Sequence, residues 1–277
     1  MVAETRNLTG KVVIITGGGT GLGKSMALTL AKAGADVVVA ARRIEPLEQT
    51  AAEVRALGRR ALAIPTDVTV SQQVNNLVQR TISEMGKLDI MINNAGIVRG
   101  ERRKQIWDIT DEEWYLGVNT NLSGAFFGCR AVSKYFATQK KGKIINTASG
   151  EGLRGVRDQY MYPCAKGGVV QLTRSLALSL AADNVQVNCI VPGFIDTRTL
   201  QPGAPAGAPA GAPAIARNDF IPVGRLGIPT DISSMALFLA SDASDYVTGG
   251  IFVVDGSGLA GGYATTGYAP IIPMEED

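Results

Sequence analysis

Short apolar runs alternate along the chain with longer stretches whose apolar residues recur at helical spacing. Seven runs rich in Val and Ile predict strands, at residues 11–15, 36–40, 61–64, 88–93, 143–148, 185–191 and 251–255. Stretches between them, such as 22–34 and 70–86, predict helices. Uninterrupted apolar strands that alternate with helices are typical of a parallel sheet covered on both faces. We therefore expect one α/β domain over residues 1–277, a Rossmann-type doubly wound parallel sheet of about seven strands with helices on both faces.

Two segments depart from this alternation. Residues 202–214, PGAPAGAPAGAPA, repeat a unit of Ala, Pro and Gly, and the recurring proline excludes a helix or a central strand. A flexible tether without a role is one interpretation. The tail at residues 259–277 is either a disordered terminus or a segment that packs on a neighbouring subunit through its tyrosines and PIIP sequence.

Composition narrows the class of protein. With 45% hydrophobic and 19% charged residues, the chain is typical of a soluble globular protein. A net charge of +2 is too small to indicate nucleic acid or an anionic membrane as a partner. The first ten residues lack the apolar core of a signal sequence, and no apolar run reaches membrane-spanning length, so we expect a cytoplasmic protein.

The three cysteines and the lack of histidine bear on metals and redox state. Cys129, Cys164 and Cys189 are far apart and odd in number, which predicts reduced, buried thiols rather than a disulfide framework. Scattered cysteines without any histidine argue against a zinc site, and we expect no metal.

A glycine-rich turn follows the first predicted strand and opens a helix. It reads TGGGTGLGKS, with Gly17, Gly21 and Gly23 spaced differently from the G-x-G-x-x-G fingerprint. Glycine lets the backbone approach a phosphate, and a helix N-terminus favours negative charge. An ordinary glycine-rich turn is the alternative, but the position between strand and helix favours a nucleotide site.

The end of the second predicted strand bears on which dinucleotide binds. NAD sites usually carry an acidic residue there, about 20 residues past the glycines, but this chain has Arg42 and Arg43. An arginine can pair with a 2′-phosphate in bidentate fashion. A solvated charge pair is the alternative. We expect NADP(H) to be preferred and NAD(H) to be possible.

The stretch YMYPCAK, from Tyr160 to Lys166, offers acid–base chemistry to a chain without histidine. Tyr162 and Lys166 are four residues apart and would share a helix face, whereas Tyr160 has Cys164 at that spacing. A nearby ammonium favours tyrosinate, so we expect the pKa of Tyr162 to fall toward neutrality. Such a phenol would serve as acid in one direction and base in the other.

Five motifs occur in an order that resembles the short-chain dehydrogenase/reductase family, over residues 8–258: TGGGTGLG, NNAG, Ser149, YPCAK and PGFIDT. The chain is also similar to 3-oxoacyl-carrier-protein reductases and to sugar or polyol dehydrogenases. The resemblance implies an oxidoreductase that transfers hydride between NADP(H) and a carbonyl or secondary alcohol. It also implies a homodimer or homotetramer, and it makes the repeat part of a substrate lid over residues 198–228.

The resemblance assigns roles to matching positions. The catalytic residues that it implies are Asn121, Ser149, Tyr162 and Lys166. Ser149 would polarise the substrate oxygen, Lys166 would also hold the nicotinamide ribose, and Asn121 would anchor a water that relays protons. The dinucleotide contacts that it implies are Gly17, Gly19, Thr20, Gly21, Leu22, Gly23, Arg42, Arg43, Asp67, Val68, Asn94, Gly96, Tyr162, Lys166, Pro192, Gly193, Ile195 and Thr197.

The substrate is less constrained than the chemistry. Basic residues follow NNAG and Ser149 and would attract an anionic substrate, although a solvated rim also explains them: Arg99, Arg102, Arg103, Lys104, Arg154 and Arg157. A 3-oxoacyl-carrier-protein reductase stays an alternative, and so does a non-catalytic NADP(H)-binding regulatory protein. Such regulators usually lose the tyrosine or the lysine. A nucleotide-sugar epimerase would carry a longer C-terminal domain and a different glycine spacing.

Overall fold

A single parallel sheet of seven strands forms the centre of the protein. The computed structural model describes residues 6–97, 104–197 and 221–260. Within them the strand order is β3-β2-β1-β4-β5-β6-β7, and every neighbouring pair is parallel. The strands are β1 (Val12–Thr16), β2 (Asp36–Ala41), β3 (Ala61–Pro65), β4 (Ile90–Asn93), β5 (Gly142–Thr147), β6 (Val185–Pro192) and β7 (Ile251–Val254). The predicted fold class is confirmed, and the predicted strands differ from these by one or two residues at their ends.

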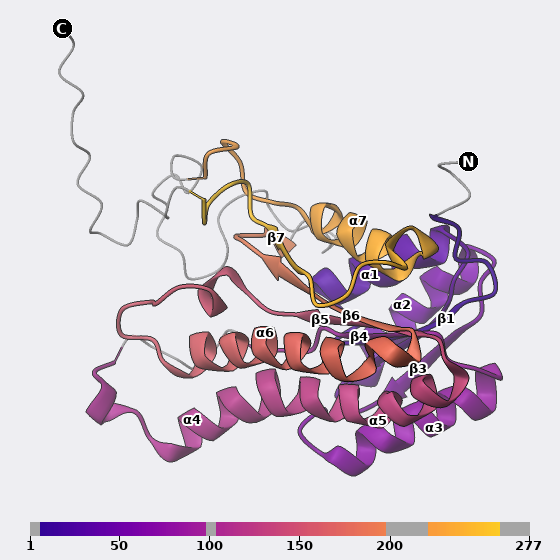
Figure 1. Cartoon of the computed structure of the whole chain (residues 1–277), viewed down its shortest axis with the longest axis horizontal. Helices are drawn as coiled ribbons and strands as arrows, with labels where there is room; N and C mark the ends of the chain where they lie inside the picture. Colours follow the sequence, from indigo (N-terminus) through magenta and orange to yellow (C-terminus); the bar gives the residue numbers. More distant parts are fainter. Residues whose placement is uncertain (1–5, 98–103, 198–220, 261–277) are drawn as a thin grey trace, which may run out of the picture.

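Helices cover both faces of the sheet and make a three-layer molecule (Figure 1). One face carries α1 (Gly21–Lys32), α2 (Ile44–Ala56) and α7 (Pro229–Ala240). The other carries α3 (Ser71–Met85), α5 (Gly124–Gln139) and α6 (Met161–Leu180), with α4 (Asp111–Val118) leading into α5. The predicted helices at 22–34 and 70–86 correspond to α1 and α3.

The period-two alternation of each buried strand supplies two hydrophobic cores. On β1, Val13 and Ile15 pack toward α1 and α7, whereas Val12 and Ile14 pack toward α3 and α5. All four side chains are at most 3% exposed. Burial on both faces explains why the strand sequences are continuously apolar rather than alternating.

The chain reverses its direction of winding at β1, which places a crevice at one edge of the sheet. From β1 it proceeds outward through β2 to β3, and it then crosses back to β4, on the other side of β1. In an open α/β sheet, ligands bind beside such a switch point, outside the carboxyl ends of the strands. The glycine turn and the NNAG segment follow β1 and β4, so both lie at this edge.

Several predicted features lie outside the described residues. The repeat at 202–214, most of the proposed lid over 198–228, and residues 261–277 of the tail are among them, as are Arg99, Arg102 and Arg103. In the part of the chain that is described, no helix has the length and apolar character that crossing a bilayer requires.

Candidate active site

The glycine turn after β1 forms a cradle too narrow for side chains. Gly17 has a φ of +69°, a conformation that glycine adopts without strain, and its N–H donates to Ala40 O at 2.7 Å. A Cβ on Gly23 would overlap the carbonyl oxygen of Gly17 and lie 2.8 Å from Asn94 Nδ2. The first turn of α1 holds no acidic residue. The loop therefore brings bare backbone and a helix N-terminus to the crevice, which fits the phosphates of a dinucleotide.

Thr16 joins the glycine turn to the segment after β4. Its hydroxyl accepts hydrogen bonds from the N–H groups of Asn94 and Ala95, both at 3.0 Å. The Asn94 amide returns a bond from Nδ2 to Thr16 O at 2.9 Å. Two of these bonds fix Asn94 to the end of β1, and the third holds its neighbour Ala95 there.

The segments after β2 and β3 lie side by side at the same edge, since Thr66 N donates to Ala41 O at 2.8 Å. Arg42 and Arg43 are exposed, and neither forms an ion pair with another described residue. The Asp67 carboxylate accepts bonds from the N–H and the hydroxyl of Thr69 at 2.9 and 2.7 Å. The Val68 side chain is buried against Gly124 of α5, so any contact of Val68 with an adenine would come from its main chain.

Ser149 lies two residues beyond β5, where a one-turn 3₁₀ helix, η4 (Gly150–Gly152), begins. Its Oγ accepts the N–H of Glu151 at 3.3 Å. It also forms a hydrogen bond with the Tyr162 hydroxyl. This contact brings the end of β5 and the first turn of α6 together, as the paired roles of the two residues require.

Burial dominates the electrostatics of Tyr162. Burial raises the pKa of Tyr162 to about 12, the hydrogen bond with Ser149 opposes the rise, and the Glu151 carboxylate adds to it. The prediction that this pKa falls toward neutrality is therefore wrong. Desolvation penalises the phenolate more than the surrounding groups stabilise it.

Lys166 is the second titratable group of the pair, and unlike the half-buried Tyr162 it is fully buried. It is 3% exposed, its Nζ donates to Thr147 O at 2.9 Å, and its ammonium lies 5.7 Å from the centroid of the Tyr162 ring. Burial lowers the pKa of Lys166 to about 8. The hydroxyl of Thr147 is also buried and has no hydrogen-bond partner among the described residues. Such a hydroxyl is a polar group that a ligand can satisfy.

Asn121 lies on a widened turn of its helix, next to the NNAG segment; Gly96 of that segment lies beside both Asn121 and Lys166. Asn121 lies in a π-helical turn, η3 (Asn119–Ser123), between α4 and α5. Its side chain accepts from Ile97 N at 3.1 Å and donates to Ile97 O and Gly117 O at 3.1 and 3.0 Å. Both amide protons are thus engaged with the main chain, and the water-anchoring role stays a prediction.

Gly96 packs against both of these residues. A Cβ on Gly96 would lie 2.6 Å from Asn121 Oδ1 and 3.3 Å from Lys166 Nζ. The glycine of NNAG therefore leaves room for the two side chains at the crevice. Its place beside them agrees with its predicted membership of the site.

The PGFIDT segment closes the crevice from the β6 side. Pro192 ends β6, and Gly193 N donates to Val254 O at 3.0 Å. The Ile195 side chain lies against Gly227, beside a hollow of about 310 Å³ that Phe194 also lines. Thr197 reaches the glycine turn, since a Cβ on Gly21 would be 3.7 Å from it. Ile195 thus turns its side chain to Gly227 and leaves its backbone as the part available to a ligand.

The structure adds contacts that the motifs did not indicate. The carbonyl that holds Lys166 belongs to Thr147, and η4 packs on α6 at Gly152. No local sequence signal marks either contact, because each joins segments that are separate along the chain. The expectation of three buried thiols is wrong for Cys164, which is exposed on α6, and all three cysteines are free.

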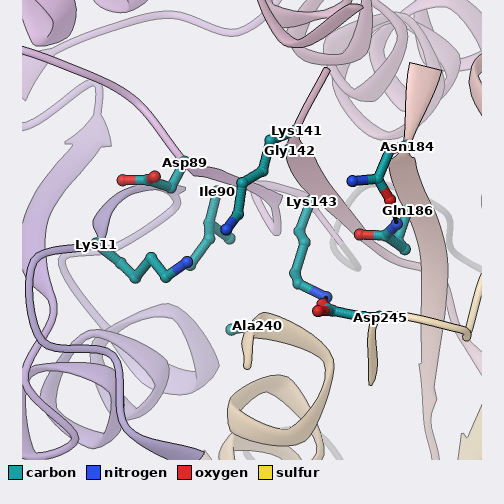
Figure 2. A pocket seen from close by; sticks show the side chains of 10 residues that line it. All are labelled: Lys11, Asp89, Ile90, Lys141, Gly142, Lys143, Asn184, Gln186, Ala240 and Asp245. Atoms are coloured by element: carbon teal, nitrogen blue, oxygen red, sulfur yellow. Dashed lines mark hydrogen bonds and ion pairs between the residues drawn. The ribbon is translucent and has the colours of Figure 1, made fainter. Parts of the chain in front are cut away.

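A second hollow lies at the opposite edge of the sheet. Figure 2 shows its lining at the amino ends of β1, β4, β5 and β6. Lys143 is the buried charge there, and its Nζ lies 2.8 Å from Asp245 Oδ1 and 3.0 Å from Ser244 Oγ. Because Lys143 is the second residue of β5 and Ser149 follows the end of that strand, this hollow is not part of the crevice.

Comparisons with known proteins agree with this geometry. Residues 11–206 match the family model for short chain dehydrogenase. The 2-dehydro-3-deoxy-D-gluconate 5-dehydrogenase of Escherichia coli strain K12 is 39% identical, over 94% of this chain and 100% of its own. The 3-oxoacyl-[acyl-carrier-protein] reductase of Thermotoga maritima is 34% identical, over 90% of this chain and 98% of its own.

A solved structure extends the similarity to three dimensions. The complex of 7α-hydroxysteroid dehydrogenase with NADH and 7-oxo glycochenodeoxycholic acid superposes with a TM-score of 0.83 at 32% identity. The match covers 92% of this chain and 96% of that one. Sequence, sheet topology and motif order all agree, and the chain belongs to the short-chain dehydrogenase/reductase family of oxidoreductases that act on CH–OH groups.

Proposed function

We propose that this protein is an NADP(H)-dependent oxidoreductase that interconverts a carbonyl and a secondary alcohol, with Tyr162 as the proton carrier. The observation that supports the proposal most is the meeting of three side chains at the crevice. Tyr162 is hydrogen-bonded to Ser149, and the Lys166 ammonium lies 5.7 Å from the phenol ring. A non-catalytic regulator would have no need to keep a half-buried phenol with a raised pKa beside a buried ammonium with a lowered pKa.

The proton chemistry follows from the state of Tyr162. With a pKa of about 12, its phenol is protonated at neutral pH and is ready to donate to a substrate carbonyl oxygen. Ser149 donates a hydrogen bond to the same oxygen and stabilises the charge that develops there. The nicotinamide, when bound, supplies the hydride that adds to the carbonyl carbon. The Lys166 ammonium then stabilises the phenolate that remains until a proton from solvent replaces the one donated.

Alcohol oxidation uses the same groups in reverse. Tyr162 must first be a phenolate in order to accept the hydroxyl proton, and its raised pKa makes this form scarce at neutral pH. The oxidation rate should therefore increase with pH above neutrality. Reduction needs the protonated phenol and does not gain from a higher pH.

Arg42 supports the preference for NADP(H). Its guanidinium is exposed at the end of β2, with no carboxylate in the adjoining positions 41 and 43 and no ion pair within the described residues. It is therefore free to pair with a 2′-phosphate at little cost in lost contacts. The neutral Thr20 of the glycine turn adds no second charge, so we expect a modest preference. The related 7α-hydroxysteroid dehydrogenase was solved with NADH.

For the substrate, we propose a keto or hydroxy derivative of a sugar acid. The support is the 39% identity to a 2-dehydro-3-deoxy-D-gluconate 5-dehydrogenase. The match covers 100% of that enzyme and 94% of this chain. Arg154 and Arg157, which follow Ser149, offer guanidinium groups that can bind a substrate carboxylate, and Arg157 lies 3.6 Å from Asp158. An acyl thioester is the second candidate, from the 34% identity to the carrier-protein reductase.

Self-association in the cytoplasm completes the proposal. Large apolar side chains are exposed on α4, on α6 and just before α4: Tyr115 at 57%, Leu178 at 84% and Trp107 at 77%. Exposed apolar surface of this kind favours burial against another protein surface. We propose a homodimer or homotetramer.

The test is an activity panel that follows dinucleotide absorbance in both directions. Wild-type protein is offered 2-dehydro-3-deoxy-D-gluconate, an acetoacetyl thioester, a steroid ketone and small ketones, each with NADP(H) and with NAD(H). We expect the sugar acid and NADP(H) to give the highest kcat/KM. Arg42→Asp should reverse the dinucleotide preference, because a carboxylate repels the 2′-phosphate and binds ribose hydroxyls. A wild-type preference for NADH would contradict the cofactor assignment, and inactivity on the whole panel would contradict the enzyme.

A further inference from the structure

We propose that Gly152 and Gly167 form a backbone contact that sets the position of Ser149 relative to Tyr162 and Lys166. Both glycines would then be positioning residues for the reaction, although neither touches a substrate. The inference rests on the proposed oxidoreductase function, and it concerns how the site is held together rather than which substrate it takes.

The η4 turn is attached rigidly to Ser149. Gly152 N donates to Ser149 O at 2.9 Å, and Leu153 N donates to Gly150 O at 3.1 Å. Glu151 N donates to the Ser149 hydroxyl oxygen at 3.3 Å. A displacement of Gly152 is therefore transmitted to Ser149 through a single i→i+3 hydrogen-bonded turn.

Gly152 faces the main chain of α6 at the position of Lys166. A Cβ on Gly152 would lie 2.6 Å from Lys166 C, 2.8 Å from Gly167 N and 2.9 Å from Lys166 Cβ. Two of these atoms belong to the main chain and the third is a Cβ attached to it, so none of them can move aside through a change of side-chain rotamer. A Cβ on Gly167 would lie 3.3 Å from Gly152 O. Neither glycine has a positive φ, so the need for glycine is a need for space.

The segment from Thr147 to Gly152 contacts both the main chain and the ammonium of Lys166. The Lys166 main chain rests on Gly152, and its Nζ donates to Thr147 O at 2.9 Å, on the strand that leads to Ser149. A methyl group at position 152 must push η4 and α6 apart. Because a displacement of about 1 Å in a catalytic group can cost about 100-fold in rate, this contact is expected to control turnover.

Three alanine substitutions provide a graded test with a matched control. Gly155 is three residues past Gly152 and has open space around its Cβ position, so Gly155→Ala is the control. We expect Gly152→Ala to lower kcat by about 10- to 100-fold, Gly167→Ala to lower it less, and Gly155→Ala to leave it unchanged. If Gly152→Ala does not fold, Gly167→Ala still tests the same contact from the α6 side, and it is expected to fold because alanine favours the helix interior.

Two readouts separate positioning from general destabilisation. The dissociation constant for NADPH, measured by titration, should change far less than kcat in all three variants, because the glycine turn and Arg42 lie elsewhere and the Lys166 ammonium keeps its bond to Thr147 O. The groups that act on Tyr162 are Ser149, Glu151 on η4 and Lys166 on α6. Loosening the Ser149 bond removes the contact that lowers the phenol's pKa, so Gly152→Ala should shift the pH–rate profile of alcohol oxidation to higher pH.

Three results would overturn the inference: wild-type kcat in Gly152→Ala, an equal loss in Gly155→Ala, or a loss of kcat with NADPH affinity falling in step and an unmoved pH profile. If wild-type protein and Gly155→Ala turn over substrate, the proposed function stands whatever Gly152→Ala does. If wild-type protein is inactive on the panel, the proposed function itself has failed.

Discussion

At the scale of single residues, Lys166 is held in surroundings that disfavour its charge. Its pKa is lowered to about 8 by burial, from an ordinary value of 10.5. Below pH 8 the folded protein holds a buried ammonium whose desolvation is only partly offset by the bond to Thr147 O. Because the unfolded chain binds this proton more tightly, the folded state loses stability at neutral pH, and the loss disappears as pH rises from about 8 to about 10.5.

We therefore predict that Lys166→Met stabilises the ligand-free protein at pH 7 by about 1–2 kcal/mol. The pKa shift corresponds to a penalty of about 3 kcal/mol in the free energy of unfolding, which the substitution removes. The variant also leaves Thr147 O without its hydrogen bond, and this loss offsets part of the gain. Urea unfolding at pH 7 and at pH 10.5 measures the effect, which should be close to zero at the higher pH. Lys134→Met, at an exposed position on α5, is the control. A Lys166→Met protein that is less stable than wild type at pH 7 would refute this interpretation.

At the scale of elements, the glycine turn and the start of α1 form one unit. Gly23 lies so close to Gly17 O and Asn94 Nδ2 that a methyl group has no room. The sequence predicted a phosphate loop here from its place between strand and helix, and the structure supplies the reason for each glycine. Sequence reasoning did not find the π-helical turn that carries Asn121, because the side-chain bond from Asn121 to Ile97 O joins segments that are far apart along the chain.

Gly23→Ala should weaken both folding and dinucleotide binding. Overpacking of a buried position typically costs about 1–3 kcal/mol, and a shifted α1 would withdraw its N–H groups from the phosphates. Thermal unfolding and NADPH titration measure the two effects. Gly19→Ala, whose Cβ would approach Pro46 Cβ at 3.0 Å, is the milder comparison in the same turn. Wild-type NADPH affinity in Gly23→Ala would show that the turn does not hold the phosphates.

At the scale of the whole molecule, the sheet order accounts for how distant motifs reach one edge. Winding outward from β1 and then back to β4 brings the glycine turn, NNAG, Ser149 and PGFIDT to the carboxyl ends of neighbouring strands. Apolar periodicity was enough to predict the doubly wound parallel sheet, whereas the strand order that gathers these motifs at one edge comes from the structure. The direction of the Tyr162 pKa shift was not predictable, because the phenol's burial depends on how η4, α6 and the strands pack together.

The most direct test of the account is the turnover of Tyr162→Phe. This substitution removes one hydroxyl from a half-buried ring and leaves Lys166, Ser149 and the glycine turn in place. We predict that carbonyl reduction falls by at least about 100-fold in kcat while NADPH affinity stays close to wild type, and that Tyr160→Phe remains nearly as active as wild type. Retained turnover in Tyr162→Phe, or a larger loss in Tyr160→Phe, would contradict the assignment of Tyr162 as the proton carrier.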